Sequence, residues 1–291
     1  MPAKSHFHHP EAGNAHTYLG FGIAPPPDTE IRNKTLRPGV YNLEYSRTIG
    51  HYITPQILKR DGIIDLPEST SEMILSEIDM FFTEEVRARY EKYCFLYRRG
   101  ILMYGVPGTG KSVTVYKIID KMIARGGIVL WNPDPDYVAP FMNQVHKIDP
   151  KIQVLVVWEE FDKYKNNTRV LQLLDGGAQI NNVVYLATTN YIGRLPDRLK
   201  NRPSRFARVV EVGPPSAEAR KMFLEARIHP DDLKDFDVQA LVDKTEGWVI
   251  DHLSEVIKSH FVIGMPLGEA VANIAKMNGL NSTTDDEDDE D

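Results

Sequence analysis

Residues 105–112 combine glycines, a lysine and a hydroxyl in an order that suits phosphate binding. They read Gly-Val-Pro-Gly-Thr-Gly-Lys-Ser and fit the pattern G-x-x-x-x-G-K-[ST]. Glycines let successive backbone N–H groups face phosphate oxygens, and the N-terminus of a following helix adds partial positive charge. Lys111 can then reach the β- and γ-phosphates of a nucleotide, and the Ser112 hydroxyl can bind Mg²⁺. The residues predicted to hold the nucleotide here are Gly105, Val106, Pro107, Gly108, Thr109, Gly110, Lys111, Ser112 and Val113.

The alternative interpretation of this segment is a glycine turn with an incidental lysine. An apolar strand precedes the loop, and an amphipathic helix follows it. Both elements are the context that a phosphate-binding loop requires, so they count against the alternative.

Two adjacent acids, Glu159 and Glu160, follow the apolar run 154–158. The first acid after such a strand lies beside the phosphate loop, because the carboxyl ends of parallel strands share one edge of the sheet. Glu159 would hold Mg²⁺ through water, and Glu160 would polarise the attacking water. A polar strand end with solvated acids is the alternative. Glu160 follows Lys111 by 49 positions, and this separation in an α/β frame favours the catalytic interpretation.

The hydrophobic periodicity of the chain predicts strands that alternate with helices, and then helices alone. The expected strands cover 101–104, 128–131, 154–158, 183–187 and 209–212, and the expected helices between them cover 112–125, 141–148 and 170–174. Four further helices are expected over 217–228, 238–245, 249–261 and 267–277. This order is typical of an α/β domain with a mostly parallel sheet, followed by an all-helical subdomain.

Five segments follow from these patterns. They are a flexible N-terminal arm over 1–38, a small β-prone element over 39–61, the α/β nucleotide-binding domain over 62–213, a helical subdomain over 214–280 and an acidic disordered tail over 281–291. The last seven residues are all acidic, and without them the 34 Lys and Arg balance 34 Asp and Glu. The body is therefore neutral, which argues against a protein that coats DNA or RNA but does not exclude a local basic strip.

The remaining composition favours a protein without membrane spans. The longest apolar run, 154–158, is far shorter than the ~20 residues of a spanning helix. Cys94 is the only cysteine, so no disulfide can form within the chain. Both features fit a cytoplasmic protein, which is the expectation.

A series of motifs resembles the AAA branch of the AAA+ ATPases. In order along the chain they are Tyr97 to Gly105 leading into the phosphate loop, the acidic strand end, Leu173-Leu-Asp175-Gly176, Ala187-Thr-Thr-Asn190, Arg202-Pro-Ser-Arg205-Phe-Ala-Arg208 and Thr245-Glu-Gly247-Trp248. The resemblance covers about residues 62–278. It implies an AAA+ P-loop NTPase core with a C-terminal helical lid, and ATP and Mg²⁺ as cofactors.

The resemblance also implies roles for single residues. Asn190 matches the residue that orients the lytic water, although a buried amide there could equally cap a turn. Arg205 and Arg208 match the arginine fingers that complete a neighbouring subunit's site, although their spacing also fits a structural loop. With Lys111 and Glu160 they form the expected catalytic set. The adenine is expected to contact Asp65 and Leu66 on one side and Gly247 and Trp248 of the lid on the other.

Three positions depart from the family pattern. Glu159 stands where an aspartate is usual, which could slow turnover. Gly177 replaces an aromatic residue in the segment that signals between subunits. Tyr137 and Val138 resemble the loop that grips polypeptide in the central pore, but Ala139 follows where the family has glycine. The alternative is that Tyr137 packs as a staple on the short helix that follows.

The expected function is a Mg²⁺-dependent ATP hydrolase that forms a homo-oligomeric ring, hexameric in this expectation, and remodels or threads a protein. The sequence does not identify that protein. The alternatives are a clamp-loader-like ATPase of DNA metabolism and a slow ATP-gated switch or scaffold. The neutral body and the lack of an arginine directly after Gly247 count against the first alternative, whereas Glu159 supports the second.

Overall fold

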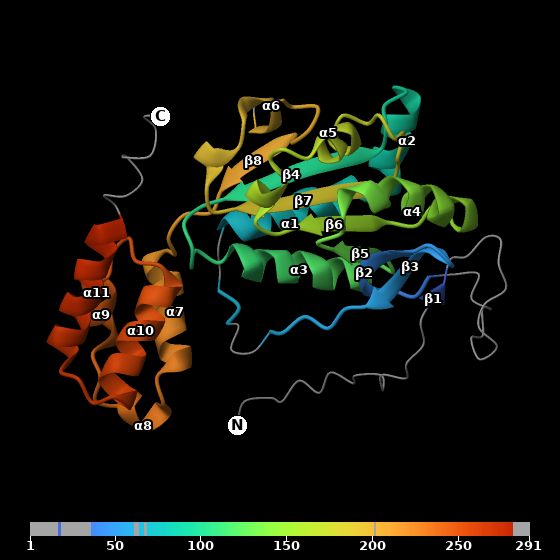
Figure 1. The fold of residues 1–291 in the computed structure, drawn as a ribbon. Coiled ribbons are helices and arrows are strands. Elements are labelled where there is room, and N and C mark those ends of the chain that lie inside the picture. Colours follow the sequence, from blue (N-terminus) through green and yellow to red (C-terminus); the bar gives the residue numbers. More distant parts are fainter. Residues whose placement is uncertain (1–16, 19–35, 61–63, 67–68, 201, 282–291) are drawn as a thin grey trace.

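A computed structural model describes residues 17–18, 36–60, 64–66, 69–200 and 202–281 of the chain (Figure 1). Most of the predicted arm over 1–38 and nearly all of the predicted acidic tail lie outside the described residues. Within the described part, an α/β body and a separate group of C-terminal helices lie side by side, joined at residues 212–216 (Figure 1).

The body is built on one eight-stranded sheet with the order β1-β3-β2-β5-β6-β7-β4-β8. The strands are β1 (Thr17–Tyr18), β2 (Gly39–Ser46), β3 (Gly50–Pro55), β4 (Arg98–Tyr104), β5 (Ile128–Trp131), β6 (Val154–Trp158), β7 (Val183–Thr189) and β8 (Arg208–Glu211). Pairing is parallel from β2 to β8 and antiparallel where β3 joins β2 and β1. The prediction of an α/β fold with a mostly parallel sheet is therefore confirmed.

The β2–β3 hairpin belongs to this sheet and is not a separate element. Gly39 to Tyr41 pair in parallel with Ile128 to Leu130 of β5, so the segment predicted as a small β-prone unit extends the main sheet. Thr17 and Tyr18, inside the segment predicted as a flexible arm, pair with Tyr52 and Ile53 of β3. Long-range pairing of this kind leaves no pattern in the local sequence, which explains why the sequence did not predict it.

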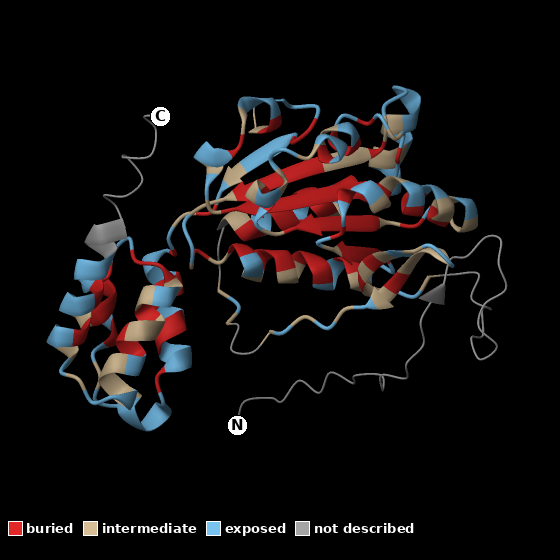
Figure 2. Cartoon of the chain, in the orientation of Figure 1, coloured by how far each residue is buried: buried red, intermediate tan, exposed pale blue. Residues whose placement is uncertain are grey.

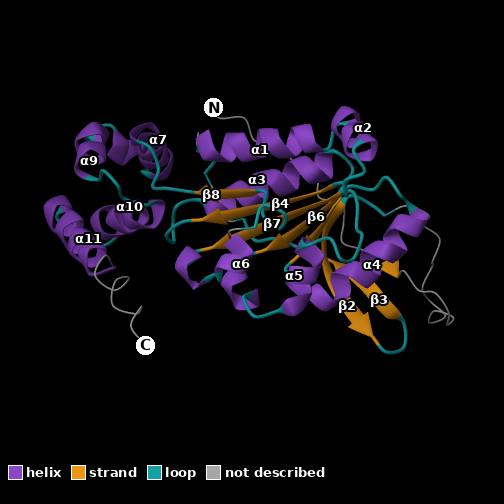
Figure 3. Cartoon of the chain, turned by 90° about the horizontal axis from the view of Figure 1, so that it is seen from above, coloured by secondary structure: helices purple, strands orange, loops and turns teal. Residues whose placement is uncertain are grey.

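Helices cover both faces of the sheet (Figure 3). Helices α1 (Ser69–Phe81) and α3 (Lys111–Ala124) lie on one face, and α4 (Pro135–Ile148), α5 (Thr168–Leu174) and α6 (Asp197–Lys200) lie on the other (Figure 3). Helix α2 (Glu84–Lys92) follows α1, and short 3₁₀ turns span Phe161–Tyr164 and Ile192–Arg194.

The core follows from the two-residue period of the strands. In β6, Val154, Val156 and Trp158 enter the cluster on the α4–α5 side, and Leu155 and Val157 enter the cluster on the α1–α3 side. All five are fully buried, so β6 lies inside the sheet and contributes to the apolar core on both of its faces (Figure 2). A strand with helices on both faces has this continuous apolar pattern.

Helix α4 begins earlier than the sequence predicted. The prediction started it after Pro140, because proline is disfavoured inside helices. In the structure it starts at Pro135, where a proline suits the first turn, and the Asp134 side chain caps it by accepting a hydrogen bond of 2.9 Å from the Asp136 N–H. Tyr137 and Val138 therefore lie within the helix, whereas the sequence placed them in a loop.

The C-terminal helices form a subdomain with its own apolar core. They are α7 (Ala217–Arg227), α8 (Pro230–Leu233), α9 (Val238–Lys244), α10 (Ile250–Ile257) and α11 (Leu267–Asn281), and a π-helical turn, Lys258–Val262, continues α10. Leu224, Val242, Leu253 and Val256 are almost completely buried in this core. We call α7–α11 the lid.

Candidate active site

The loop between β4 and α3 has the backbone shape that phosphate binding requires. Gly108 has φ +80° and Gly110 has φ +93°, values that residues with a Cβ rarely adopt. Gly110 is the N-cap of α3, so the first N–H groups of that helix face the loop. A Cβ at Gly105 would overlap the Val212 carbonyl oxygen, so this position also requires glycine.

Lys111 is folded onto its own loop. Its Nζ donates to the carbonyl oxygens of Gly105 at 2.6 Å and Val106 at 2.8 Å. Burial lowers the pKa of Lys111 to about 8, although Asp251 and Glu159 oppose this shift. An anionic phosphate would compensate the desolvation that a buried ammonium group suffers, so the side chain suits a phosphate ligand.

Ser112 and Glu159 meet at the end of β6. The Ser112 Oγ donates to Glu159 Oε1 over 2.8 Å. The backbone N–H of Glu159 donates to Asn132 Oδ1 over 2.7 Å, and this bond fixes the strand end next to β5. Asn132 adopts a left-handed conformation with φ +44°, and no motif in the sequence singles it out.

These two side chains fit a magnesium ion. Their oxygens lie 2.8 Å apart, and a hydroxyl and a carboxylate are both oxygen donors of the kind that would hold Mg²⁺, directly or through water. Burial, and to a smaller extent Glu160, raises the pKa of Glu159, while the Ser112 hydrogen bond opposes the rise. A carboxylate that is destabilised in this way gains from a bound cation.

Glu160 has a different environment from Glu159. Its backbone is left-handed, with φ +53° and ψ +54°, so its side chain leaves the direction of the strand. The carboxylate pairs with Lys163 and is 57% exposed. Glu160 therefore lies at the predicted place beside Glu159, and in this structure Lys163 engages its carboxylate.

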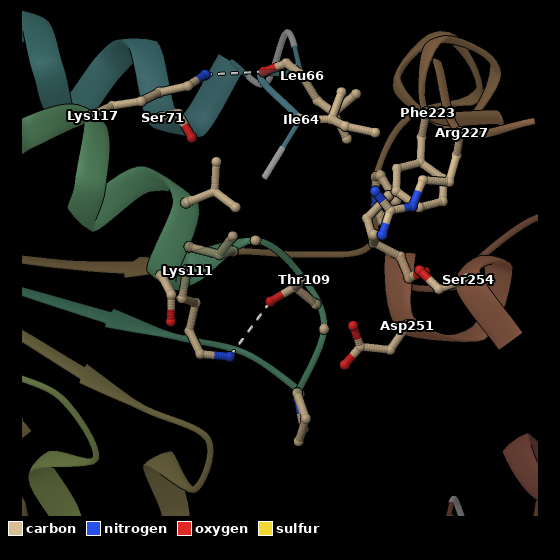
Figure 4. A pocket seen from close by; sticks show the side chains of 18 of the residues that line it. Ile64, Leu66, Ser71, Thr109, Lys111, Lys117, Phe223, Arg227, Asp251 and Ser254 are labelled. Carbon is tan, nitrogen blue, oxygen red and sulfur yellow. Dashed lines mark hydrogen bonds between the residues drawn. The ribbon is translucent and has the colours of Figure 1, made fainter. Parts of the chain in front are cut away.

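A cavity of about 440 Å³ extends from the phosphate loop to the lid (Figure 4). Residues 107–113 of the phosphate loop line it on one side, and Ile64, Leu66 and Phe223 contribute apolar side chains on the other (Figure 4). Leu66 was predicted to contact the base and lines the cavity. Asp65 was predicted as well, but its side chain is exposed and pairs with Lys117.

The lid contributes different residues from those predicted. Trp248 is 7% exposed and packs in the lid core against His252, with ring centroids 5.8 Å apart, so the prediction that it covers the base is wrong. Gly247, with φ +76°, forms the turn before it. The cavity is instead lined from α10 by Ile250, Asp251 and Ser254, and from α7 by Phe223 and Arg227 (Figure 4).

The lid touches the phosphate loop directly. The Ile250 N–H donates to the Gly108 carbonyl oxygen over 3.1 Å. Asp251 points from α10 toward the loop, and a Cβ at Gly108 would lie 2.9 Å from its carboxylate (Figure 4). An acidic side chain thus lies where the loop would receive phosphate, a feature that the sequence analysis missed.

Asn190 lines the same cavity, at the end of β7. The preceding Thr189 is buried, and its Oγ1 donates to Asp162 Oδ1 over 2.8 Å. This bond connects the end of β7 to the segment after Glu160. The structure therefore brings Lys111, Ser112, Glu159 and Asn190 to one edge of the sheet.

Arg205 and Arg208 differ sharply in their surroundings. Arg205 is 5% exposed and forms a double ion pair with Asp175, at 2.7 and 2.6 Å. Arg208 begins the edge strand β8, is 46% exposed and donates from Nε to Glu77 over 2.9 Å. For Arg205 the buried ion pair agrees with the structural-loop alternative, whereas Arg208 keeps a partly exposed guanidinium.

Tyr137 and Val138 lie in the first turn of α4 and are not in a loop. Val138 is fully buried in the core between α4 and the sheet. The Tyr137 ring contacts Tyr45 and His51 of the β2–β3 hairpin, with centroids 5.6 Å apart in each case. A pore loop requires exposed side chains, so the structure supports the packing alternative, with the hairpin as the partner.

Among the described residues, no helix is both long and apolar enough to cross a membrane. The same part of the chain has no cluster of three or more His, Cys, Asp or Glu side chains that could hold a metal. The pair of oxygens from Ser112 and Glu159 is thus the candidate cation site on the described residues.

Residues 101–214 match the family model described as "ATPase family associated with various cellular activities (AAA)". The ATPase family gene 2 protein of Schizosaccharomyces pombe is 29% identical over 169 residues, which are 51% of this chain and 20% of that protein. The cell division cycle protein 48 homolog of Archaeoglobus fulgidus is 27% identical over 185 residues, 55% of this chain and 24% of that protein.

A third relative is proteasome-activating nucleotidase 2 of Haloferax volcanii. It is 23% identical over 173 residues, which are 51% of this chain and 41% of that protein. The matched region thus spans between a fifth and about two fifths of the length of these relatives.

Proposed function

We propose that this chain, whose residues 101–214 match the AAA family model, hydrolyses ATP with Mg²⁺ in a ring of identical subunits. The observation that carries the proposal is the 2.8 Å contact between Ser112 and Glu159. It joins the phosphate loop to the acidic strand end, so the residues for binding phosphate and holding a cation form one site.

The residues of this chain divide the chemistry between them. Lys111 and the N–H groups of the loop bind the phosphates, and the apolar end at Leu66 and Phe223 accommodates the base. Ser112 and Glu159 hold Mg²⁺, which when bound neutralises phosphate charge. Glu160 accepts the proton of the attacking water, and Asn190 orients that water.

The arginine that lines the described cavity, Arg227, comes from the lid of the same subunit, and the ring is proposed as the source of a second arginine. Arginine that stabilises the transferring phosphoryl group can come from a neighbouring subunit. Arg208 suits this task because it lies on the edge strand and is half-exposed.

Six copies and a protein substrate are the further parts of the proposal. A relative named for activation of the proteasome supports a protein substrate. The proposed compartment is the cytoplasm, since the free Cys94 can form no disulfide within the chain.

The experiment measures ATP hydrolysis per subunit against protein concentration, with no addition, with an unfolded protein and with primed DNA. We expect the rate per subunit to rise as rings form, and to rise further with unfolded protein. Lys111→Ala is the control, because loss of its ammonium group should abolish nucleotide binding. Stimulation by primed DNA alone would favour a clamp-loader-like ATPase, and a rate independent of concentration would contradict the ring.

A slow ATP-gated switch is the second candidate, and the Glu160–Lys163 ion pair favours it. A carboxylate that is held by a lysine is less available as a base. Lys163→Ala should then raise the hydrolysis rate, whereas Lys165→Ala, a matched change two residues away, should not. An unchanged rate in Lys163→Ala would remove the support for this candidate.

A further inference from the structure

The segment 202–208 is fixed to the body through the side chain of Arg205. Its Nε and Nη2 donate to the two carboxylate oxygens of Asp175, at 2.7 and 2.6 Å, and Nη1 donates to the Arg198 carbonyl oxygen. All three guanidinium nitrogens are therefore engaged within the subunit. The pair also lowers the pKa of Asp175, so the carboxylate is charged at neutral pH.

The neighbours of Arg205 are anchored as well. Phe206 is 2% exposed and meets Phe161 edge to face, with ring centroids 5.3 Å apart. A Cβ at Gly100 would overlap the Arg205 carbonyl oxygen, so the backbone of the segment packs directly on β4. These contacts fix the backbone of the segment at Arg205 and at the residue that follows it.

Arg98 also connects the turn after α5 to the segment 202–208. Arg98 on β4 donates from Nη2 to the Ser204 carbonyl oxygen over 3.1 Å and from Nη1 to the Leu174 carbonyl oxygen. Leu174 ends α5 and directly precedes Asp175. Two arginines, Arg205 of the segment and Arg98 of β4, thus connect the turn after α5 to the segment 202–208.

Moving Arg205 to a neighbouring subunit would be unfavourable. It would separate a buried, doubly bonded guanidinium from Asp175 and leave that carboxylate beside Leu174 without its partner. Asp175 is 37% exposed, so the cost of separating the pair lies mainly with the buried guanidinium, which would lose hydrogen bonds to three acceptors. Arg208 faces a much smaller barrier, since only its Nε is bonded to Glu77 and nearly half of its side chain is exposed.

We propose that Arg205 is a positioning residue that, through Asp175, fixes the segment 202–208 so that Arg208 reaches the neighbouring subunit's phosphate site. This inference rests on the proposed function, because it assigns the arginine that a ring of ATPase subunits requires. It also gives the turn Asp175-Gly176-Gly177 a task, since any movement of this turn is transmitted through the ion pair to Arg208.

The variant Asp175→Asn distinguishes a positioning role of Arg205 from a direct role of Arg205 at the neighbouring subunit's phosphate site. The change keeps the size of the side chain but removes the charge that holds Arg205. If Arg205 positions, Asp175→Asn and Arg205→Lys should each lower hydrolysis by about 10- to 100-fold, because small displacements of a catalytic group have such effects. The double variant should be no slower than the slower single variant, since both changes break one pair. If Arg205 is itself the finger, Asp175→Asn should release it and leave hydrolysis unchanged or faster, which would overturn the proposal.

The melting temperature of the subunit without nucleotide is the second readout. Asp175→Asn and Arg205→Lys should each lower it by about 5 °C, again without additivity, because the pair lies within one subunit. Arg202→Gln is the matched control, an exposed arginine on the same segment, and should change neither readout. Full additivity in melting temperature would show that the two side chains do not act as a pair.

Arg208→Gln tests the proposed function separately. It should abolish hydrolysis, keep binding of a fluorescent ATP analogue, and regain activity when mixed with Lys111→Ala protein, which supplies an intact Arg208. Co-assembly without rescue would contradict action between subunits and so the proposed ring chemistry. Rescue of Arg208→Gln together with full activity of Asp175→Asn would contradict only the positioning role of Arg205.

Discussion

Glu159→Gln should have opposite effects on stability and on magnesium use. The change keeps the shape of the side chain and replaces a carboxylate by a neutral amide. In the protein without ligand, burial and the adjacent Glu160 disfavour the charged carboxylate, which is why the pKa of Glu159 is raised. A raised pKa in the folded state means that the charged carboxylate is less favourable there than in the unfolded chain, so above the pKa of the unfolded chain this environment lowers the free energy of unfolding.

The expected magnitudes follow from this environment. Relief of a pair of like charges is worth up to about 1 kcal/mol, which corresponds to a rise of about 2 °C in melting temperature for a protein of this size. The amide oxygen can still accept the Ser112 hydrogen bond of 2.8 Å, so that contact need not be lost. The Mg²⁺ concentration for half-maximal binding of an ATP analogue should rise by about 10- to 100-fold, as for other disrupted metal sites.

The assay is a Mg²⁺ titration of fluorescent ATP-analogue binding, together with thermal unfolding without nucleotide. Glu160→Gln is the matched control, since it removes the same charge one residue away. It should slow hydrolysis by about 10²- to 10⁴-fold with little change in the Mg²⁺ requirement, because Glu160 acts on water. Equal Mg²⁺ requirements for Glu159→Gln and the unmodified protein would refute the assignment of Glu159 as a cation ligand.

Three further changes test other parts of the structure. Asp251→Asn should raise the affinity for ATP by about 3- to 10-fold in nucleotide titrations, because a carboxylate beside Gly108 repels phosphate; weaker binding would show that Asp251 contributes favourably. Tyr137→Ala should lower the free energy of unfolding in urea by about 1–3 kcal/mol and leave ATP binding intact, because the ring packs on Tyr45; unchanged stability with loss of remodelling would instead restore the pore-loop interpretation. Burial lowers the pKa of His146, although Asp149 opposes the shift, so the unfolded chain takes up the proton first and stability should fall as pH drops below about 6.5; urea unfolding of His146→Gln should show a shallower fall, and an identical one would remove His146 as the cause.

The phosphate loop and the acidic strand end could be predicted from the sequence because their chemistry is contiguous. Each needs a short run of residues directly after a buried strand, and the strand order brings the runs together. The 2.8 Å contact between Ser112 and Glu159 joins residues 47 positions apart, but it follows from two parallel strands that end at one edge. Local patterns were therefore sufficient at this site.

The role of Arg205 could not be predicted in the same way. Its partner Asp175 lies 30 residues away in a turn, and no periodicity connects the two. The sequence showed two arginines three residues apart, and the choice between burial and exposure depends on packing against Gly100 and Phe161. Packing between residues far apart in the sequence buries Arg205 and leaves Arg208 partly exposed.

The lid shows a third kind of discrepancy. The glycine turn before α10 was located correctly, but the apolar Trp248 was assigned to the base although it fills the lid core. The cavity is lined by residues one turn further on, among them Asp251 and Ser254. A large aromatic side chain gains more from burial in a core than from an open cleft, and this preference decided its position.

The conformation of Glu160 connects the candidate base with the arginine segment. A left-handed backbone at a residue with a side chain costs roughly 1–2 kcal/mol, so it persists only where the surroundings require it. Here it directs the Glu160 side chain to solvent and Lys163, and it lets the next residue, Phe161, turn into the core against Phe206. Phe206 directly follows Arg205, so one aromatic contact connects the residue next to Glu160, the proposed base, with the segment that carries Arg208. A change in the backbone at Glu160 would therefore move Phe161 and, through Phe206, the arginine that we assign to the neighbouring subunit.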